Sequence, residues 1–453
     1  MNKDTNISTV TRRTFLESTG KAAAAGAVLS QMPIDRVAHA TGDDTVNVAL
    51  IGCGGRGTGA VKQALSTEGP VKLVAMADAF RDCLDGSLRS VSAKFENTPD
   101  RIDVGENGKF IGPDAYKKAT SLADVVILTT PPGFRPYMFA EAVRQGKNVF
   151  MEKPVATDAH GVRIVLEAAR EAKKKNLKVG VGLQRHHDEG YQEAVKRIHD
   201  GELGEITSMR SYWNGRGVWG PRATRDQVKT EMEYQMRNWY YYVWLSGDHI
   251  CEQHIHNLDV INWVKGFNYP IAASGMGGRQ MRTDKKYGEI FDHHFVEFEY
   301  ADGSRNYSQC RHIEGCQNSV SEHIMGTEGR ANVSGQIFFN RQGELKWRFG
   351  RRSKNPYQVE HDRLFDAIRN NKPHMEAEYG AKSTMTAILG RLATYTGKRL
   401  TWDQALNSKV VLVPNDIGYK NGVWTGTPPS KPDGQGSYPV AVPGDKEWFQ
   451  KLI

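Results

Sequence analysis

The sequence lacks the features that mark several classes of protein. Only five of its 453 residues are cysteine, an odd number without a Cys-x-x-Cys pair, so the chain is not a disulfide scaffold. Cys310 and Cys316 could pair in an oxidising compartment, but two free thiols are the better expectation. After residue 40, no apolar run approaches the roughly 20 residues that a spanning helix needs. We therefore expect a chain without a membrane span.

The positive charge is not concentrated anywhere in the chain. The net charge is +8, and the first forty residues hold five Lys or Arg and three Asp or Glu, which leaves +6 for the rest. Basic and acidic residues are interspersed without a basic block or arm, which is typical of a solvated surface. This pattern argues against a nucleic-acid partner. There is also no internal repeat and no low-complexity tract.

The first forty residues carry an export pattern. Arg12 and Arg13 precede Phe15 and Leu16, a short and mildly apolar stretch "KAAAAGAVLSQM" follows, and "AHA" offers a cleavage site. This order of features is typical of a twin-arginine signal, which exports folded proteins. Residues 1–40 are therefore predicted to be a signal peptide, and the mature protein to be periplasmic or otherwise extracytoplasmic. The alternative is an N-terminal tail with a chance arginine pair.

A glycine loop follows the first strand expected in the mature chain. The continuous apolar run 46–51 suits a buried parallel strand, Gly52, Gly54 and Gly57 have Gly-x-Gly-x-x-Gly spacing, and 60–65 begins a helix. The first glycine makes a tight turn, the second lets the backbone approach a pyrophosphate, and the third lets helix and strand pack closely. The helix N-terminus then meets the phosphates, so the pattern predicts a dinucleotide site.

An acidic residue stands where a ribose ligand is expected. A second strand, "VKLVAMAD", ends at Asp78, which lies 21 residues beyond Gly57. A carboxylate there binds the ribose hydroxyls and repels a 2′-phosphate, which favours NAD. Arg81 lies close enough to keep NADP open as an alternative.

Strands and helices continue to alternate up to residue 183. This alternation predicts an α/β fold with a doubly wound parallel sheet. The expected strands are 123–132, 147–154 and 177–183, and the expected helices are 136–145 and 159–175.

The second half of the chain has a different pattern, with several strands in which polar and apolar residues alternate. A helix is expected over 190–201, and alternating stretches such as 205–214, 293–303 and 329–335 suit strands with one solvated face. Two further helices are expected within 357–397, returning to brace the first domain, and an irregular tail follows. The predicted division is a signal peptide and four further segments: 1–40, 41–183, 184–356, 357–408 and 409–453.

Four motifs in this order resemble one oxidoreductase family. "GCGGRG", "TTPPGFRP", "GKNVFMEKP" and "EQHIHNLD" are similar to motifs of the Gfo/Idh/MocA family, named after glucose–fructose oxidoreductase, inositol dehydrogenase and a rhizopine catabolic protein. The resemblance covers about residues 44–405. It implies a Rossmann domain followed by an α/β domain with an open, mainly antiparallel sheet, which carries substrate residues and often oligomer contacts. A homo-oligomer is therefore expected.

The chain departs from the family pattern at two places. The family usually has Asp-x-x-x-His in the catalytic segment, where this chain has Glu252 and His256. Family members often place a histidine after the Thr-Pro-Pro turn, where this chain has Gly133, Phe134 and Arg135. The departures concern the substrate class and leave the predicted fold unchanged.

The motifs give a set of candidate site residues. By resemblance, Lys153 binds the substrate oxygen and His256 is the base. A carboxylate, Glu252 or Asp259, would orient the imidazole. The predicted cofactor-binding residues are Gly52, Gly54, Gly55, Arg56, Gly57, Asp78, Thr130, Pro131, Glu152 and Lys153.

The spacing of the catalytic segment is compatible with this chemistry and with two others. Glu252 and His256 are four residues apart, which would place them on one helix face. Dehydrogenation of an alcohol needs a group that takes the hydroxyl proton, and a histidine with a pKa of about 6.5 suits that role. A metal site of His249, Glu252, His254 and His256 is the competing prediction, although no metal is expected. A buried structural histidine is the other.

Aromatic and histidine-rich stretches have two interpretations. "WYYYVWLSGDH", residues 239–249, is either core packing or a platform for a sugar ring, and Tyr241 is a second candidate base. The pairs 186–187 and 293–294 are either pocket edges or surface and core histidines.

Together these patterns predict an exported NAD-dependent oxidoreductase that acts on a sugar, a polyol or a glycoside. An exported site cannot draw on a free dinucleotide pool, so the cofactor must be retained and regenerated in each cycle. Two alternatives stay open. The first is an NAD-dependent glycosidase working by oxidation, elimination, hydration and reduction. The second is a sugar-binding protein without turnover, because a fold does not establish a function.

Overall fold

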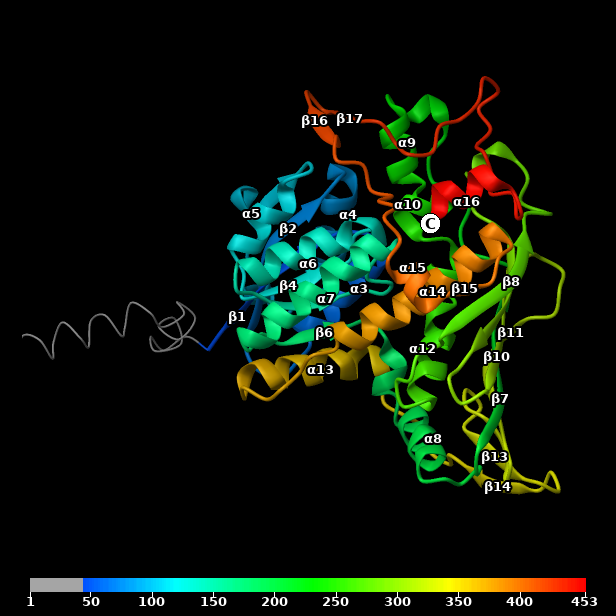
Figure 1. Cartoon of the computed structure of the whole chain (residues 1–453). Coiled ribbons are helices and arrows are strands. Elements are labelled where there is room, and N and C mark those ends of the chain that lie inside the picture. Colours follow the sequence, from blue (N-terminus) through cyan, green and yellow to red (C-terminus); the bar gives the residue numbers. More distant parts are fainter. Residues whose placement is uncertain (1–43) are drawn as a thin grey trace, which may run out of the picture. The chain divides into compact units, whose positions relative to one another are not determined.

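The predicted parallel sheet is present in the computed structural model, which describes residues 44–453 (Figure 1). The predicted signal peptide, residues 1–40, lies outside the described residues. The sheet has six strands in the order β3-β2-β1-β4-β5-β6, and every neighbouring pair is parallel. The strands are β1 (Val46–Ile51), β2 (Val71–Asp78), β3 (Lys109–Ile111), β4 (Val125–Leu128), β5 (Asn148–Met151) and β6 (Val179–Val181).

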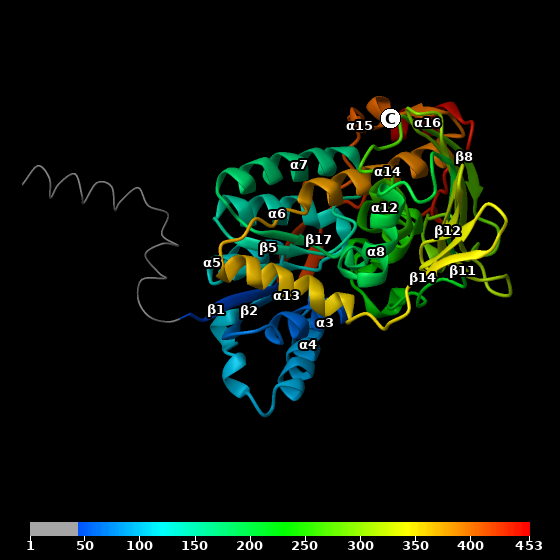
Figure 2. The same ribbon diagram turned by 90° about the horizontal axis from the view of Figure 1, so that it is seen from below.

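Helices cover both faces of this sheet. One layer contains α5, α6 and α7, and the other contains α3, α4 and the later helix α13 (Figure 2). Strands buried on both faces explain the continuous apolar runs of β1 and β4. The helices are α3 (Gly55–Leu65), α4 (Arg81–Lys94), α5 (Ala115–Ser121), α6 (Arg135–Arg144), α7 (Ala159–Lys174) and α13 (Pro356–Arg369).

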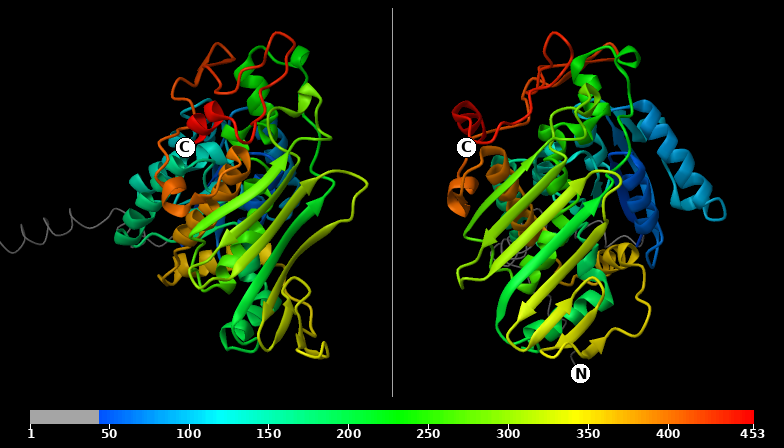
Figure 3. Two further views of the ribbon diagram at one scale, coloured as in Figure 1. Left: turned by 45° about the vertical axis from the view of Figure 1, so that its right-hand side comes forward. Right: turned by 90° about the vertical axis from the view of Figure 1, so that its right-hand side faces the viewer.

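A second sheet of nine strands follows in the C-terminal half (Figure 3). Its order is β14-β13-β12-β11-β7-β10-β9-β8-β15, and it is antiparallel apart from the parallel pair β7–β10. The mainly antiparallel sheet is therefore confirmed. Its strands are β7 (Ile206–Gly215), β8 (Ala272–Gly278), β9 (His293–Glu299), β10 (Arg305–His312), β11 (Ser319–Gly326), β12 (Gly329–Asn332), β13 (Ile337–Asn340), β14 (Leu345–Arg348) and β15 (Leu400–Thr401).

One helix joins the two sheets. The 20-residue helix α14 (Ala377–Thr396) contacts α7 beside the parallel sheet and β8 and β9 of the second sheet. Its many small residues allow this close packing: a Cβ at Gly390 would lie 2.8 Å from Cζ of Phe298. The other helices in this half are α8 (Glu189–His199), α9 (Glu231–Arg237), α10 (Val243–Ser246), α11 (His249–Glu252), α12 (Ile255–Val264), α15 (Trp402–Leu406) and α16 (Lys446–Leu452).

The structure differs from the sequence expectations in the catalytic segment and in the tail. The segment expected to form one helix through Glu252 and His256 is broken into α11 and α12. The tail expected to be irregular contains the hairpin of β16 (Gly418–Lys420) and β17 (Val423–Thr425), as well as α16. All five cysteines are free, including Cys310 and Cys316. Across residues 44–453, no helix combines the length and apolar character needed to cross a membrane.

Candidate functional site

The glycine loop between β1 and α3 leaves room for a ligand. Gly52 has φ of +94°, and a Cβ there would lie 2.5 Å from the backbone nitrogen of Thr130. A Cβ at Gly57 would lie 2.0 Å from the Gly52 oxygen, so both positions need glycine. At Gly54 and Gly55, by contrast, a Cβ would meet no protein atom within 4 Å. The loop is therefore tight against the protein and open toward the space where a pyrophosphate is expected.

Asp78 ends β2 beside this loop. Its Oδ2 accepts a hydrogen bond of 2.6 Å from the Cys53 N–H, and its Oδ1 accepts one of 2.8 Å from the Phe80 N–H. Burial raises the pKa of the Asp78 carboxyl above its ordinary value. Each carboxylate oxygen has a second lone pair, so the group can still accept hydrogen bonds from ribose hydroxyls.

A cavity of about 1170 Å³ opens along the carboxyl edge of the parallel sheet. Open α/β sheets bind ligands at this edge. The predicted cofactor residues that line the cavity are Gly52, Gly54, Gly55, Arg56, Gly57, Asp78, Thr130 and Pro131. Glu152 and Lys153 are not among the lining residues. These residues and the space they enclose fit a dinucleotide.

Arg56 connects the glycine loop to the segment that carries Lys153. Its guanidinium donates to Glu152, and it donates to Glu360 over 3.1 Å. Burial by itself would raise the pKa of the Glu152 carboxyl, but the charges of Arg56 and Lys153 hold it below its ordinary value. Arg56 thus pairs with a buried carboxylate while part of its surface faces the cavity.

Arg135 begins α6, directly after the turn that follows β4. Its buried guanidinium donates to the carbonyl oxygens of Thr130 and Pro154. Burial lowers the pKa of Arg135 to about 10, so it stays charged near neutral pH. Arg135 therefore holds the turn after β4 against the turn that follows Lys153, a role that the sequence did not indicate.

Lys153 and Glu252 form an ion pair between the two halves of the chain. The Lys153 Nζ donates to Glu252 Oε1 over 3.0 Å and to the Glu252 backbone oxygen over 2.6 Å. Both side chains are 11% exposed. Of the two predicted acids, Glu252 is thus the one that contacts Lys153.

His256 is buried close to this pair. Its ring stacks on Trp213 with centroids 5.9 Å apart, and among residues 44–453 its Nδ1 has no hydrogen-bond partner. Burial, followed by the positive charge of Lys153, holds the pKa of His256 well below its ordinary value. The imidazole is therefore neutral near pH 7, and one of its ring nitrogens can accept a hydrogen bond.

The break between α11 and α12 changes the predicted geometry. The His254 N–H donates to the His249 oxygen five residues earlier, which widens the turn between the two helices. Glu252 and His256 therefore do not lie on one continuous helix. Asp259, the other predicted acid, accepts from Ser383 over 2.8 Å and lies 2.7 Å from the His186 Nε2.

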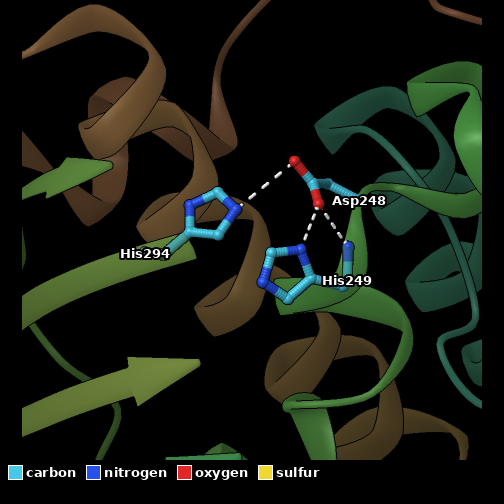
Figure 4. A group of neighbouring side chains, drawn as sticks. All are labelled: Asp248, His249 and His294. Atoms are coloured by element: carbon cyan, nitrogen blue, oxygen red, sulfur yellow. Dashed lines mark hydrogen bonds and ion pairs between the residues drawn. The ribbon is translucent and has the colours of Figure 1, made fainter. Parts of the chain in front are cut away.

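A buried carboxylate fixes the start of α11. Asp248 lies between His249 and His294, and all three side chains are fully buried (Figure 4). Its Oδ1 is 2.7 Å from His249 Nδ1, and its Oδ2 accepts from the Phe291 N–H and the Tyr395 hydroxyl. Asp248 also has φ of +69°, a strained backbone for a residue with a side chain. Because these donors occupy its oxygens, we assign it a positioning role for the turn that carries Glu252.

The other predicted ligands and pocket edges have structural partners. His254 of the predicted metal set lies 2.7 Å from the Ser308 hydroxyl. His186 packs against Trp263 with ring centroids 4.3 Å apart, and His187 lies 3.2 Å from Glu376. His293 contacts Asp292, while His294 belongs to the Asp248 cluster.

The aromatic stretch is mostly core. Four of its aromatic rings are fully buried, those of Tyr240, Tyr241, Tyr242 and Trp244. The Tyr241 hydroxyl donates to the Trp219 carbonyl oxygen. Trp239 is the exception, since it lines the cavity together with Trp219.

Comparisons with known proteins agree with this geometry. Residues 46–182 match the Gfo/Idh/MocA family profile, described as "Oxidoreductase family, NAD-binding Rossmann fold". The chain is 25% identical over 264 residues to an inositol 2-dehydrogenase of Serratia proteamaculans, covering 58% of this chain and 66% of the relative. An inositol 2-dehydrogenase of Rhizobium meliloti is 25% identical over 252 residues, covering 56% and 64%. The aligned part thus spans just under two thirds of these relatives.

Solved structures share the fold over most of the chain. An aldose–aldose oxidoreductase from Caulobacter crescentus has a TM-score of 0.61 at 17% identity, covering 79% of this chain and 99% of that one. A scyllo-inositol dehydrogenase from Lactobacillus casei, solved with NAD(H) and scyllo-inositol, has a TM-score of 0.58 at 20% identity, covering 80% and 100%. Residues 46–182 thus form a Rossmann domain that matches the NAD-binding profile of the Gfo/Idh/MocA oxidoreductase family.

Proposed function

We propose that the protein is an NAD-dependent oxidoreductase that moves a hydride between the cofactor and a hydroxyl-bearing carbon of a sugar, a polyol or a glycoside. The observation that carries this proposal is that Lys153, in an ion pair with Glu252, lies near enough to the buried His256 to influence its pKa. Inositol dehydrogenases and an aldose–aldose oxidoreductase among the similar proteins support a polyhydroxylated substrate.

The residues divide the proton chemistry between them. Bound NAD would supply the hydride acceptor. The Lys153 ammonium donates a hydrogen bond to the substrate oxygen and stabilises negative charge that develops there. His256, neutral in the resting protein, takes the hydroxyl proton. Glu252 fixes the position of the lysine, and Arg135 holds the turn next to it.

We also propose that residues 1–40 export the folded protein with NAD already bound. The supporting observation is the order of twin arginines, apolar stretch and A-x-A site. Replacing Arg12 and Arg13 by lysine should keep the precursor in the cytoplasm, because a receptor reads the signal. Cell fractionation checks this, and normal export of the double variant would rule out the twin-arginine route. A homo-oligomer is proposed for the mature chain, and sedimentation velocity tests it.

One experiment separates the oxidoreductase from the alternative glycosidase. The mature protein is incubated in heavy water with aryl glycosides, without added NAD or acceptor. An oxidoreductase reduces its bound cofactor once and resumes only when an aldose or ketose acceptor is added. A glycosidase releases the aglycone continuously and incorporates deuterium next to the oxidised carbon. A protein that binds the sugar and never reduces NAD would instead be the sugar-binding alternative.

A further inference from the structure

The C-terminal tail contributes part of the cavity wall. Loops of the Rossmann domain and the segment 219–239 line much of the cavity. The tail adds Val411, Val413, Pro414, Asn415, Ile417 and Trp424. Most of these side chains are apolar, and Trp424 is 4% exposed. The tail is therefore packed into the edge of the cofactor cavity.

Both ends of this stretch are fastened to the Rossmann domain. At its start, the Leu412 N–H donates to Asp158 Oδ2 over 2.7 Å. At its end, the Trp424 Nε1–H donates to the Ala79 oxygen over 3.2 Å, and its ring packs edge-on against Phe80 with centroids 6.3 Å apart. Ala79 and Phe80 directly follow the ribose acid, so Trp424 stands at the ribose end of the cavity.

The same stretch is also attached to the C-terminal half. The Thr230 hydroxyl donates to the Trp424 oxygen over 2.8 Å, and Arg237, which stacks on Phe80 at 3.9 Å, comes from the same helix, α9. Figure 1 shows the hairpin β16–β17 beside α9. Trp424 is thus held between the two halves of the chain.

The route of the tail crosses the glycine loop. A Cβ at Gly133, after β4, would lie 3.3 Å from Val413, whereas Trp424 packs against the residues after β2. In the sheet order, β1 lies between β2 and β4. The tail therefore passes from one side of the glycine loop to the other, over the edge where the dinucleotide is expected.

We propose that residues 411–424 form the outer wall of the NAD site and hold the cofactor in place between turnovers, with Trp424 as the main contact. This inference rests on the proposed function for its cofactor. Release of NAD then requires the indole to leave Phe80 and Ala79, which slows dissociation without taking part in hydride transfer. A retained cofactor is what an enzyme needs where no dinucleotide pool supplies it.

The experiment measures cofactor release from the full mature chain. Protein loaded with NADH is mixed with excess NAD, and the loss of bound NADH fluorescence is followed. Trp424→Ala should release NADH at least about 10-fold faster than the wild type, since affinity changes act mostly through dissociation. Trp424→Phe keeps an aromatic ring, so its rate of NADH release should lie between those of the wild type and Trp424→Ala. Trp448→Ala, in α16 of the same tail and outside the cavity lining, is the matched control and should match the wild type.

A second measurement keeps the test independent of whether Trp424→Ala folds. Lys420 is exposed but paired in the β16–β17 hairpin, so trypsin cleaves after it only when the tail opens. Bound NAD should slow cleavage there at least about 3-fold, because the tail opens less often when the cofactor fills the cavity. If the wild type binds NAD but release from the folded Trp424 variants is unchanged, or cleavage at Lys420 does not respond to NAD, this inference fails alone. If the wild type binds no NAD, the proposed function fails with it.

Discussion

The candidate site depends on two buried side chains with different environments, Lys153 and His256. Lys153 is charged and paired with Glu252, while His256 is neutral because burial and the charge of Lys153 oppose its protonation. A positive donor for an oxygen and a neutral acceptor for a proton are the two groups that oxidation of an alcohol needs.

Lys153→Ala and His256→Gln should each lower kcat by about 10²- to 10⁴-fold, the usual effect of removing a positioned acid–base group. Both variants should keep the native fold and stoichiometric NAD. Turnover of the best substrate and bound NAD measure this. His293→Gln, beside Asp292 and outside the site, is the control that should retain activity. Near-normal turnover of either folded site variant would contradict its assigned role.

Asp78→Ala should raise the Kd for NAD by roughly 10- to 100-fold, since hydrogen bonds to a charged group contribute about 1.5–3 kcal/mol. The preference for NAD over NADP should narrow, because the charge that repels a 2′-phosphate is gone. Titration calorimetry with both cofactors measures this. Asp82→Asn, which lines the same cavity without being the predicted ribose acid, should keep the preference. An unchanged Kd for Asp78→Ala would show that another group binds the ribose.

At the scale of elements, the start of α11 determines where Glu252 lies. Asp248 accepts hydrogen bonds from its own helix, from Phe291 before β9 and from Tyr395 in α14. Through Asp248, the turn that carries Glu252, the partner of Lys153, is attached to the second sheet and to α14.

Asp248→Asn should lower the free energy of unfolding by about 2 kcal/mol, because an amide NH₂ replaces one buried acceptor and faces donors. It should also reduce kcat, since Glu252 loses its fixed turn. Urea unfolding and turnover measure the two effects. Asp284 lies at an exposed turn and accepts a hydrogen bond from the Lys286 N–H. Asp284→Asn should change neither the free energy of unfolding nor kcat. Wild-type stability of Asp248→Asn would show that the cluster does not support α11.

The sequence predicted elements with strong local patterns and missed contacts made at long range. The glycine loop was predicted correctly because its spacing reports local backbone geometry, whereas the roles of Asp78, Lys153 and His256 stay predictions. The break between α11 and α12 was missed, since helical spacing of apolar residues is the same on both sides of a widened turn. The tail was missed because Trp424 has no local pattern, and its partner Ala79 is 345 residues away.

At the scale of the whole molecule, buried histidines couple the fold to pH. His254 and His294 are buried between α11, α12, α14 and the second sheet. Burial lowers the pKa of His254 to about 3 and that of His294 to about 4. Both stay neutral in the folded protein under conditions in which the unfolded chain, with histidine pKa values of about 6.5, takes up protons.

The unfolded state therefore binds more protons than the folded state below pH 6.5, and stability must fall as the pH falls. Each histidine contributes about 1.4 kcal/mol per pH unit from about pH 6.5 down to its own folded pKa, so both act down to about pH 4 and His254 alone continues to about pH 3. Urea unfolding at a series of pH values measures the slope. His254→Gln should reduce it by about 1.4 kcal/mol per unit between pH 6 and 4. His199→Gln, exposed at the end of α8, should leave it as in the wild type. An equal slope in His254→Gln and the wild type would mean that His254 is already protonated in the folded protein.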